Sequence, residues 1–569
     1  MAKYKKNKPP KKVEKKTIKR LSEQNDVPFF ERLNQFLSKR SIVFIAISVL
    51  LCLLVSLLLF DLKVSIGGDD SSYISRAYNF IHKGQFPTFQ GPIYPILLSI
   101  PIALFGIKIT LLKLLSLVFI LIHLILFNKA LEKIVPPIVR IITIFLIAIN
   151  GYIAFFASST YNEAFFLMLQ SIFFLYFVNH FVVAEDHDQD NIAIGSMVML
   201  GFIMFIMAQT RFISIGAVAA VMIYFLIYKQ WKRAGLSTGI FAVFYVGFSL
   251  ITKFVIKAKG AGMSSQMETL LLKHPYKPEE GTEDVMGFFM RIVDNSNLYL
   301  GRTFLVESGF RPITGATLNG SLTLLVYAIL IGGFIYAIRN KEKGVIFSYL
   351  YAGSLSILTF VVLQKYWDQN RMIIIMYPFL WMFAFYLLYQ IFNSKFLKGF
   401  QPIFLIVSAL LILPGVGRTF TKIGDHSTTL RKNLSGDKLY GFTDDWVNYI
   451  KTVQWAHENL EDYYIICRKP QIAFIYTEGT IHKGTGLKET DPKKALEHLK
   501  ENGVTHIVRA SLRRNPAVNS GQVINTVHNY MARIEQAYPG TFKVVHAEGK
   551  TEPAYLFEIN YYGIEQPNN

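Results

Sequence analysis

The chain has 569 residues, of which 52% are hydrophobic and only 17% are charged, and its formal net charge is +20. A soluble domain has about 25% charged residues, so this composition indicates an integral membrane protein and excludes a disordered, collagen-like or coiled-coil chain. In a soluble protein such a positive charge would suggest a nucleic-acid partner. In a membrane protein Lys and Arg set the topology, and we expect no nucleic acid among the partners.

Basic residues are concentrated at the start of the chain. Residues 1–40 contain thirteen Lys and Arg against four acidic residues, which accounts for +9 of the total charge. Pro9, Pro10 and the lack of a long apolar run predict a disordered cytoplasmic tail. Two interpretations of its charge stay open, namely contact with anionic membrane lipids and a topology signal alone.

Apolar runs long enough to cross a bilayer recur along residues 41–416. Lys and Arg gather in alternate connections between them, so the positive-inside rule places the N-terminus in the cytoplasm. The longer outer loops are then 61–108, 256–320 and 363–371, and an odd number of spans puts the termini on opposite sides. We predict eleven spans, at 42–60, 109–127, 139–157, 163–183, 192–209, 212–228, 237–255, 321–338, 345–362, 372–391 and 401–416.

The composition changes after Gly415, and residues 417–569 have soluble character. Alternating helix and strand patterns predict a small extracytoplasmic α/β domain there. The fold class is therefore an α-helical polytopic membrane protein with this α/β domain at its C-terminus. The predicted helices are 444–460, 492–502 and 523–538, and the predicted strands are 463–467, 505–509, 542–546 and 555–559.

The first outer loop contains two adjacent acids, Asp69 and Asp70, which follow two glycines and precede a helical pattern. An Asp at the start of a helix caps free N–H groups and favours the positive end of the helix dipole. Two adjacent carboxylates at a membrane surface also fit a general base or a cation site. These residues alone leave both interpretations open.

The residues around this pair resemble the first extracytoplasmic loop of the GT-C glycosyltransferases, a group that includes the protein O-mannosyltransferases and the aminoarabinose transferases of lipid A. The resemblance implies a GT-C fold in which Asp69, with Asp70 beside it, is catalytic and Asp69 is the base. Tyr73 and Tyr94 would line the substrate, and Gly91 stands where some members have a basic residue. The matching residues are Asp69, Asp70, Tyr73, Ala77, Gly84, Pro92, Tyr94 and Pro95.

Later segments extend the resemblance to residues 40–560. Glu163, at the end of a Ser-Ser-Thr-Tyr-Asn-Glu run, would orient the acceptor or a cation, unless it is only a carboxylate at the membrane surface. Arg211 and Arg371 would hold the donor phosphate, because Arg is always charged and binds phosphate bidentately; simple interface anchors are the alternative. Lys365 and Tyr366 are weaker candidates, for the phosphate and for the substrate lining respectively.

The resemblance implies a glycosyltransferase of the cell membrane. It would move a sugar from a polyprenyl-phosphate donor to a hydroxyl or amine of a protein, lipid or glycan acceptor at the outer face, with inversion. It leaves open a divalent cation, bound by Asp69, Asp70 or Glu163. The rival class is a multi-span transporter or lipid flippase without transferase chemistry.

Overall fold

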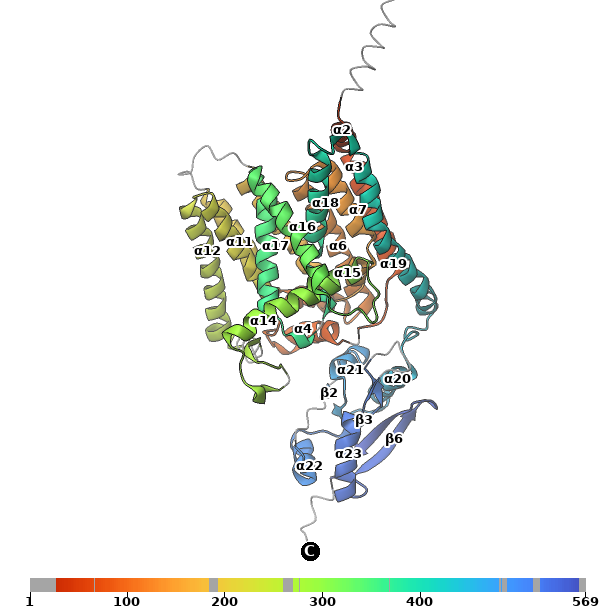
Figure 1. Cartoon of the computed structure of the whole chain (residues 1–569). Helices are drawn as coiled ribbons and strands as arrows, with labels where there is room; N and C mark the ends of the chain where they lie inside the picture. The colour runs from red at the N-terminus through yellow and green to blue at the C-terminus, as the bar shows by residue number, and fades with distance from the viewer. Residues whose placement is uncertain are drawn as a thin grey trace, which may run out of the picture.

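The computed structural model describes residues 27–65, 67–183, 193–258, 270–275, 277–367, 369–479, 482–483, 489–514 and 522–561. It shows a long bundle of helices with a smaller mixed domain at one end (Figure 1). The basic segment 1–26 lies outside the described residues. The rest of the predicted tail is not disordered, because residues 29–39 form helix α2 (Phe29–Lys39), which buries Phe30 and Leu37 against the bundle.

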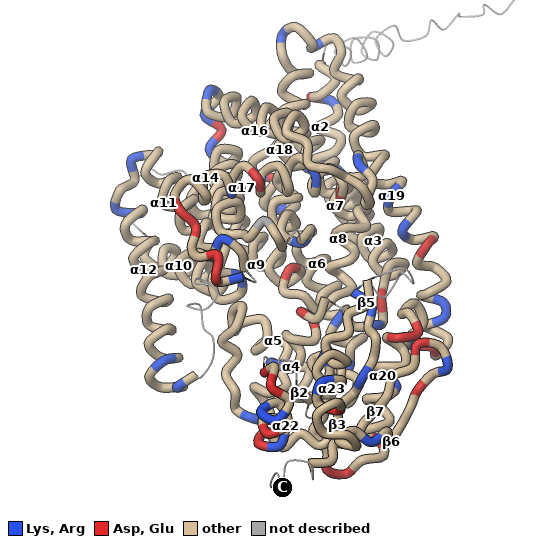
Figure 2. Tube along the Cα trace, turned by 60° about the horizontal axis from the view of Figure 1, so that its bottom comes forward, with Lys and Arg blue, Asp and Glu red and all other residues tan. Residues whose placement is uncertain are grey.

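Each predicted span corresponds to an apolar helix of the bundle. In the described part of the chain, seven helices are long and apolar enough to cross a bilayer. They are α3 (Ser41–Leu58), α6 (Ile109–Leu131), α9 with its continuation (Asn162–Val182), α12 with its continuation (Trp231–Val255), α16 (Gly320–Arg339), α17 (Lys343–Val362) and α19 (Ile403–Leu434). Figure 2 shows long stretches of these helices without charged residues, whereas charges gather in the C-terminal domain.

The remaining predicted spans are shorter or broken. The predicted span 139–157 consists of α7 (Pro137–Ile149) and α8 (Gly151–Ala157), which meet at an angle of 61°. The bend lies at Asn150, whose side chain caps α8 and donates a hydrogen bond to Tyr377 Oη. The other three are α10 (Ile194–Ala208), α11 (Ile215–Ile227) and α18 (Tyr377–Asn393).

The connections predicted to be cytoplasmic lie at the end of the bundle that carries α2. Asn34 of α2 accepts a hydrogen bond from Ile138 N at the start of α7. Gly344, at the start of α17, lies against Ile134 and Val182. The C-terminal domain lies at the opposite end (Figure 1). The alternation of the predicted loops therefore agrees with the observed fold.

The outer loops contain helices of their own. Loop 61–108 forms α4 (Asp69–Lys83) and α5 (Ile93–Phe105), and α4 begins where Gly68 adopts a φ of +87° that other residues rarely reach. Loop 256–320 forms α14 (Val285–Ser296) and α15 (Phe304–Glu307). Helix α19 continues to Leu434, well beyond the predicted end of its span at 416, and carries the chain to the C-terminal domain.

The C-terminal domain is the predicted small α/β unit. Its five-stranded sheet has the order β2-β1-β3-β7-β6, with β1 parallel to β2 and β3, and β7 antiparallel to β3 and β6. The strands are β1 (Ile465–Ile466), β2 (His482–Lys483), β3 (His506–Arg509), β6 (Phe542–Glu548) and β7 (Ala554–Ile559); β4 (Leu512–Arg513) and β5 (Val523–Ile524) form a separate pair. The helices are α20 (Asp444–Asn459), α21 (Pro470–Tyr476), α22 (Pro492–Glu501) and α23 (Thr526–Ala537).

Two details of this domain differ from the prediction. The last predicted helix begins only at Thr526, because Val523 and Ile524 pair with β4. Helix α21 was not predicted, and it packs on α4 of the membrane domain. Phe474 of α21 meets the ring of Tyr78 edge-on, with the ring centroids 5.2 Å apart. The C-terminal domain is thus docked on the helix that begins at Asp69.

Candidate active site

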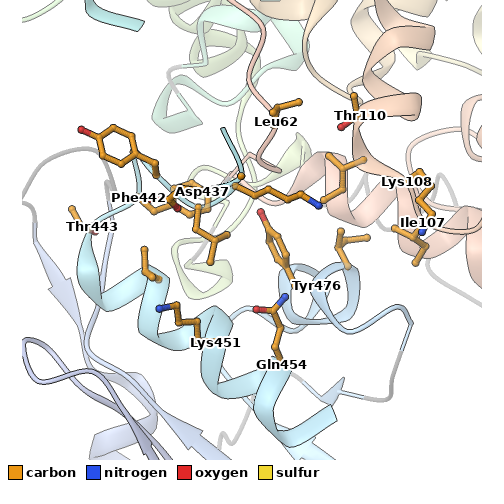
Figure 3. Close-up of a pocket in the computed structure, with 18 of the residues that line it drawn as sticks. Leu62, Ile107, Lys108, Thr110, Asp437, Phe442, Thr443, Lys451, Gln454 and Tyr476 are labelled. Atoms are coloured by element: carbon orange, nitrogen blue, oxygen red, sulfur yellow. The ribbon is translucent and has the colours of Figure 1, made fainter. Parts of the chain in front are cut away.

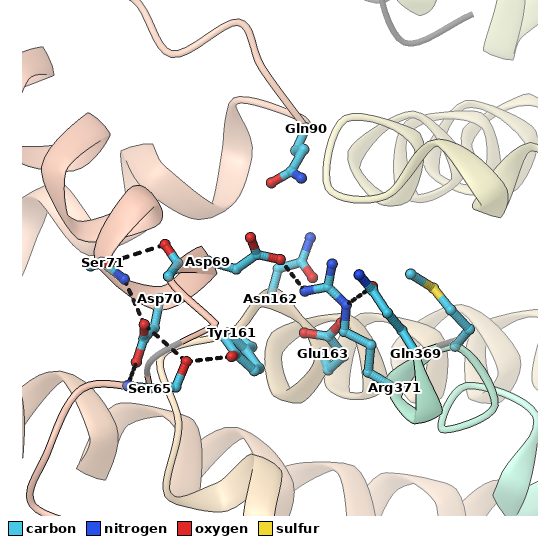
Figure 4. Close-up of polar contacts among 12 residues, drawn as sticks. Ser65, Asp69, Asp70, Ser71, Gln90, Tyr161, Asn162, Glu163, Gln369 and Arg371 are labelled. Carbon is cyan, nitrogen blue, oxygen red and sulfur yellow. Dashed lines mark hydrogen bonds and ion pairs between the residues drawn. The ribbon is translucent and has the colours of Figure 1, made fainter. Parts of the chain in front are cut away.

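Four charged side chains that lie far apart in the sequence meet at the end of the bundle that carries the C-terminal domain. Asp69 opens α4, Glu163 lies in the first turn of α9, Arg211 lies in the turn between α10 and α11, and Arg371 lies in the loop before α18. Arg211 Nη1 is 2.8 Å from Glu163 Oε1, and Arg371 Nε is 3.9 Å from the same oxygen. Arg371 Nη1 forms an ion pair with Asp69 Oδ2 (Figure 4). The structure therefore brings together four of the residues predicted from the sequence.

The structure separates the two adjacent acids. The Asp70 side chain is buried and turns toward the chain that precedes it (Figure 4). It accepts hydrogen bonds from Ser65 N at 2.6 Å and from Ser71 N at 2.8 Å, and burial raises its pKa. The Asp69 side chain is 33% exposed and faces Arg371. Asp70 is therefore engaged in shaping the loop, and Asp69 is the carboxylate that a substrate can reach.

This division of roles predicts different effects of removing each acid. Asp70→Ala should lower the free energy of unfolding by about 1–3 kcal/mol, because the N–H groups of half-buried Ser65 and buried Ser71 lose their acceptor. Asp70→Asn, which keeps one acceptor oxygen, should cost less. Thermal unfolding of the detergent-purified protein measures both. Full stability of Asp70→Ala would show that the loop does not need this carboxylate.

Glu163 and Arg211 form the buried part of the cluster. The Glu163 side chain is 1% exposed and that of Arg211 is 11% exposed. Removing one partner of such a buried pair leaves an uncompensated charge, so replacing either residue alone should destabilise the protein. Arg211 also lies over the ring of Phe166, with 5.8 Å between its Cζ and the ring centroid. Among the described residues, Glu163 Oε2 has no hydrogen-bond partner.

Arg371 is held from several sides. Its Nε donates to Gln369 Oε1 at 2.8 Å, and its guanidinium lies over the ring of Tyr161, with Cζ 5.7 Å from the centroid. Burial alone would lower the pKa of Arg371, but the carboxylates of Glu163 and Asp69 raise it above its ordinary value. The guanidinium is therefore a permanent, well-positioned cation with 17% of its side chain exposed.

A second polar layer fixes the loop that carries Arg371. Asn370 donates to Glu307 Oε1 at 2.9 Å, and its carbonyl accepts a hydrogen bond of 2.6 Å from Tyr152 Oη. Gln369, Asn370, Glu307 and Tyr152 are not predicted from the sequence. Gln369 and Asn370 stand directly before the predicted span 372–391, whereas nothing local singles out Tyr152 or Glu307.

Close packing explains why position 91 is a glycine, where some GT-C members have a basic residue. It adopts a φ of +88°, and a Cβ added there would lie 2.4 Å from the carbonyl oxygen of Gln209. Ile93 N donates to the same carbonyl at 3.4 Å. The first outer loop therefore packs directly on the turn that carries Arg211, and a side chain at position 91 has no room.

Gly91→Ala should consequently displace this turn and reduce both stability and activity. We expect a loss of about 1–3 kcal/mol in unfolding free energy, from the strained backbone and the backbone clash together. Gly84→Ala is the control, because Gly84 also has a positive φ, of +62°, but nothing lies within 4 Å of its added Cβ. The difference in thermal unfolding between the two variants measures the effect of the clash with the Gln209 carbonyl. Equal losses of stability would show that this carbonyl does not limit the size of residue 91.

Of the other predicted residues, Tyr73 and Tyr94 lie beside the cluster. The ring of Tyr73 is buried, and burial, with the nearby Glu163 charge, raises its pKa to about 12. Tyr94 is fully buried and meets Tyr73 edge-on, with centroids 5.1 Å apart. Tyr366 is 48% exposed and its ring centroid is 4.3 Å from that of His274. The side chain of Lys365 lies outside the described part of the structure.

A cleft lies between the two domains, separate from the charged cluster. Its volume is about 1230 Å³ and its lining comes from the start of α6, the chain around Gly441, and helices α20 and α21 (Figure 3). Three lysines line it, namely Lys108, Lys438 and Lys451. Tyr476 of α21 also lines it.

The carboxylates of the cluster do not fit a metal centre in this arrangement. The guanidinium of Arg371 contacts Asp69 and lies beside Glu163, so both carboxylates already face a cationic side chain. In the described ranges of the chain, no three His, Cys, Asp or Glu side chains are grouped as metal ligands.

Comparison with known proteins identifies the fold. No protein-family model and no curated protein sequence matches the chain. The crystal structure of the Archaeoglobus fulgidus oligosaccharyltransferase with zinc and sulfate superposes with a TM-score of 0.54 and 12% identity, over 82% of this chain and 68% of that one. ArnT from Cupriavidus metallidurans bound to undecaprenyl phosphate superposes with a TM-score of 0.53 and 12% identity, over 92% of this chain and 98% of that one. The chain therefore shares the fold of these two proteins, which agrees with the fold that its sequence resemblance implied.

Proposed function

We propose that the protein is an inverting membrane glycosyltransferase. It moves a sugar from a polyprenyl-phosphate-linked donor to a hydroxyl or amine of a lipid, glycan or protein acceptor. One observation carries the proposal: Asp69, a partly exposed carboxylate, forms an ion pair with Arg371, which lies beside buried Glu163 and its partner Arg211 at the outer end of a GT-C fold. Two of the solved structures that match are an oligosaccharyltransferase and an ArnT bound to undecaprenyl phosphate, which agrees with a lipid-phosphate donor.

The charges of the cluster suit a single displacement. Arg371 and Arg211 bind the donor phosphate and neutralise the charge that grows on it as the bond from the anomeric carbon to the phosphate oxygen breaks. Asp69 accepts the proton of the acceptor group while that group forms its bond to the anomeric carbon from the opposite side. The sugar passes through an oxocarbenium-like transition state, as in glycosidases, and polyprenyl phosphate leaves.

Glu163 has a supporting role in this scheme. It is nearly fully buried and pairs with Arg211, beside Arg371. It therefore keeps two like-charged guanidinium groups close together, which would repel each other without a shared carboxylate. This position favours orientation of the phosphate-binding residues; the acceptor-orienting role implied by the family resemblance remains a prediction.

We further propose that the N-terminus is cytoplasmic and that the charged cluster and C-terminal domain lie on the outer face of the cell membrane. The basic connections lie at the α2 end of the bundle, which the positive-inside rule assigns to the cytoplasm. An apolar carrier would place its phosphate at the outer membrane surface, within reach of Arg371. Cysteine accessibility to a membrane-impermeant reagent, with single cysteines at Ser38 and at Ser435, tests this orientation.

The test of the activity uses the full-length protein in proteoliposomes with undecaprenyl-phosphate sugars labelled in the sugar, and native membranes as the acceptor source. We expect label to move from the donor into the acceptor fraction, with one undecaprenyl phosphate released for each sugar transferred. Label that crosses the bilayer while still attached to its lipid would instead identify a flippase or transporter.

A further inference from the structure

The four side chains of the charged cluster carry balanced charges, and the charges of Arg76 and Lys469 also act on Asp69 from outside the cluster. Asp69 and Glu163 supply two negative charges, and Arg211 and Arg371 supply two positive ones. The proposed donor brings a further negative charge, on its phosphate. A phosphate oxygen cannot take a position on a guanidinium that a carboxylate oxygen already fills, so a carboxylate must move away from any nitrogen that the phosphate is to contact.

The structure distinguishes which carboxylate can leave. Glu163 is 1% exposed and pairs with Arg211, so moving it would expose or strand a buried charge. Asp69 is 33% exposed, lies at the first residue of α4, and touches the outer nitrogen Nη1 of Arg371. Water can solvate Asp69 once the contact breaks. Asp69 is therefore the partner that exchanges.

Arg371 can stay in place during this exchange. Its Nε is fixed by Gln369 and lies near Glu163, and its guanidinium plane lies over the Tyr161 ring. Only the Nη1 contact to Asp69 needs to change. A phosphate oxygen that replaces Asp69 Oδ2 there would meet a pre-oriented guanidinium.

We infer that Asp69 occupies the phosphate-binding position on Arg371 in the substrate-free protein, so that donor binding itself frees the catalytic carboxylate. This inference rests on the proposed function. This exchange makes Asp69 available to an acceptor only when a donor is bound, because without donor Asp69 is held in the ion pair with Arg371. Asp69 is then an internal competitor of the donor phosphate as well as the base.

Competition from Asp69 lowers the apparent affinity of the protein for phosphate. If Asp69 occupies Arg371 in about nine-tenths of the molecules, the apparent affinity for phosphate is about tenfold below the intrinsic one. Removing the catalytic carboxylate should therefore strengthen phosphate binding by about tenfold while it removes activity. A carboxylate that only supports the local structure would have no such effect.

The experiment measures binding of undecaprenyl phosphate to the full-length protein in nanodiscs. We expect Asp69→Asn and, as a second variant, Asp69→Ala to bind about tenfold more tightly than the wild type. Asp61→Asn is the matched control, because Asp61 is an acid of the same outer loop whose partner is Lys63, at 3.0 Å, and not Arg371. Its affinity should stay within twofold of the wild type.

Each other outcome is decisive. Wild-type protein that binds undecaprenyl phosphate, with Asp69 variants that bind equally or more weakly, would overturn the competition and leave the proposed function standing. An equal gain of affinity in Asp61→Asn would show that the loss of any negative charge in this loop strengthens binding, and it would also overturn the competition. Failure of both the wild type and the Asp69 variants to bind would contradict the phosphate site of the proposed function itself.

Discussion

Replacement of Asp69 by Asn is expected to reduce sugar transfer by about 10²–10⁴-fold, the range that a positioned general base contributes. The amide has nearly the same shape as the carboxylate but cannot accept the proton of the acceptor group. Because Asp69 is partly exposed, its loss should leave the thermal unfolding midpoint almost unchanged. Initial rates at saturating donor, together with unfolding curves, measure the two effects separately.

Asp444→Asn provides the matched control for this variant. Asp444 also opens a helix, α20, and is exposed, so the same substitution removes a charge at an equivalent helix position outside the cluster. It should keep full activity. Asp69→Asn with more than a tenth of wild-type activity would show that another group serves as the base.

Replacement of Arg371 by Ala is expected to lower turnover by about 10²–10³-fold, the usual loss when one group that stabilises developing negative charge is removed. The variant should still fold, because Glu163 keeps its 2.8 Å pair with Arg211 and Asp69 can turn to water. Arg371→Lys should recover only part of the loss, since an ammonium cannot keep both the Gln369 contact and a bidentate phosphate contact. Transfer rates at increasing donor concentration measure both variants.

Arg431→Ala is a suitable control for the loss of a positive charge, because Arg431 is exposed near the end of α19. It should behave as the wild type. If Arg371→Ala retained most of its turnover and its donor KM, the assignment of the donor phosphate to Arg371 would be wrong.

Much of the fold could be predicted because the bilayer imposes a simple pattern on the sequence. Long apolar runs such as those of α3, α6 and α16 predict spans directly, since a helix in lipid must satisfy its own backbone hydrogen bonds. The C-terminal α/β unit is predicted from its alternating helix and strand patterns, which are also local features of the sequence. The resemblance to GT-C loops then selected four residues that the fold brings together, namely Asp69, Glu163, Arg211 and Arg371.

What the sequence could not predict depends on contacts between distant segments. The inward turn of Asp70 requires the backbone of Ser65, and nothing in the Asp-Asp pair reveals which acid turns inward. The bend at Asn150 depends on the hydroxyl of Tyr377, which follows it by 227 residues. The support of the Arg371 loop by Glu307 likewise joins two outer loops. Such contacts become visible only when the helices are assembled.

The most direct test of the account is an experimental structure of the full-length protein with bound undecaprenyl phosphate. The account predicts that the phosphate contacts Arg371 and Arg211 and that Asp69 no longer contacts Arg371. A phosphate bound instead in the cleft between the domains, beside Lys108, Lys438 and Lys451, would contradict the central claim that the cluster around Arg371 is the transferase site.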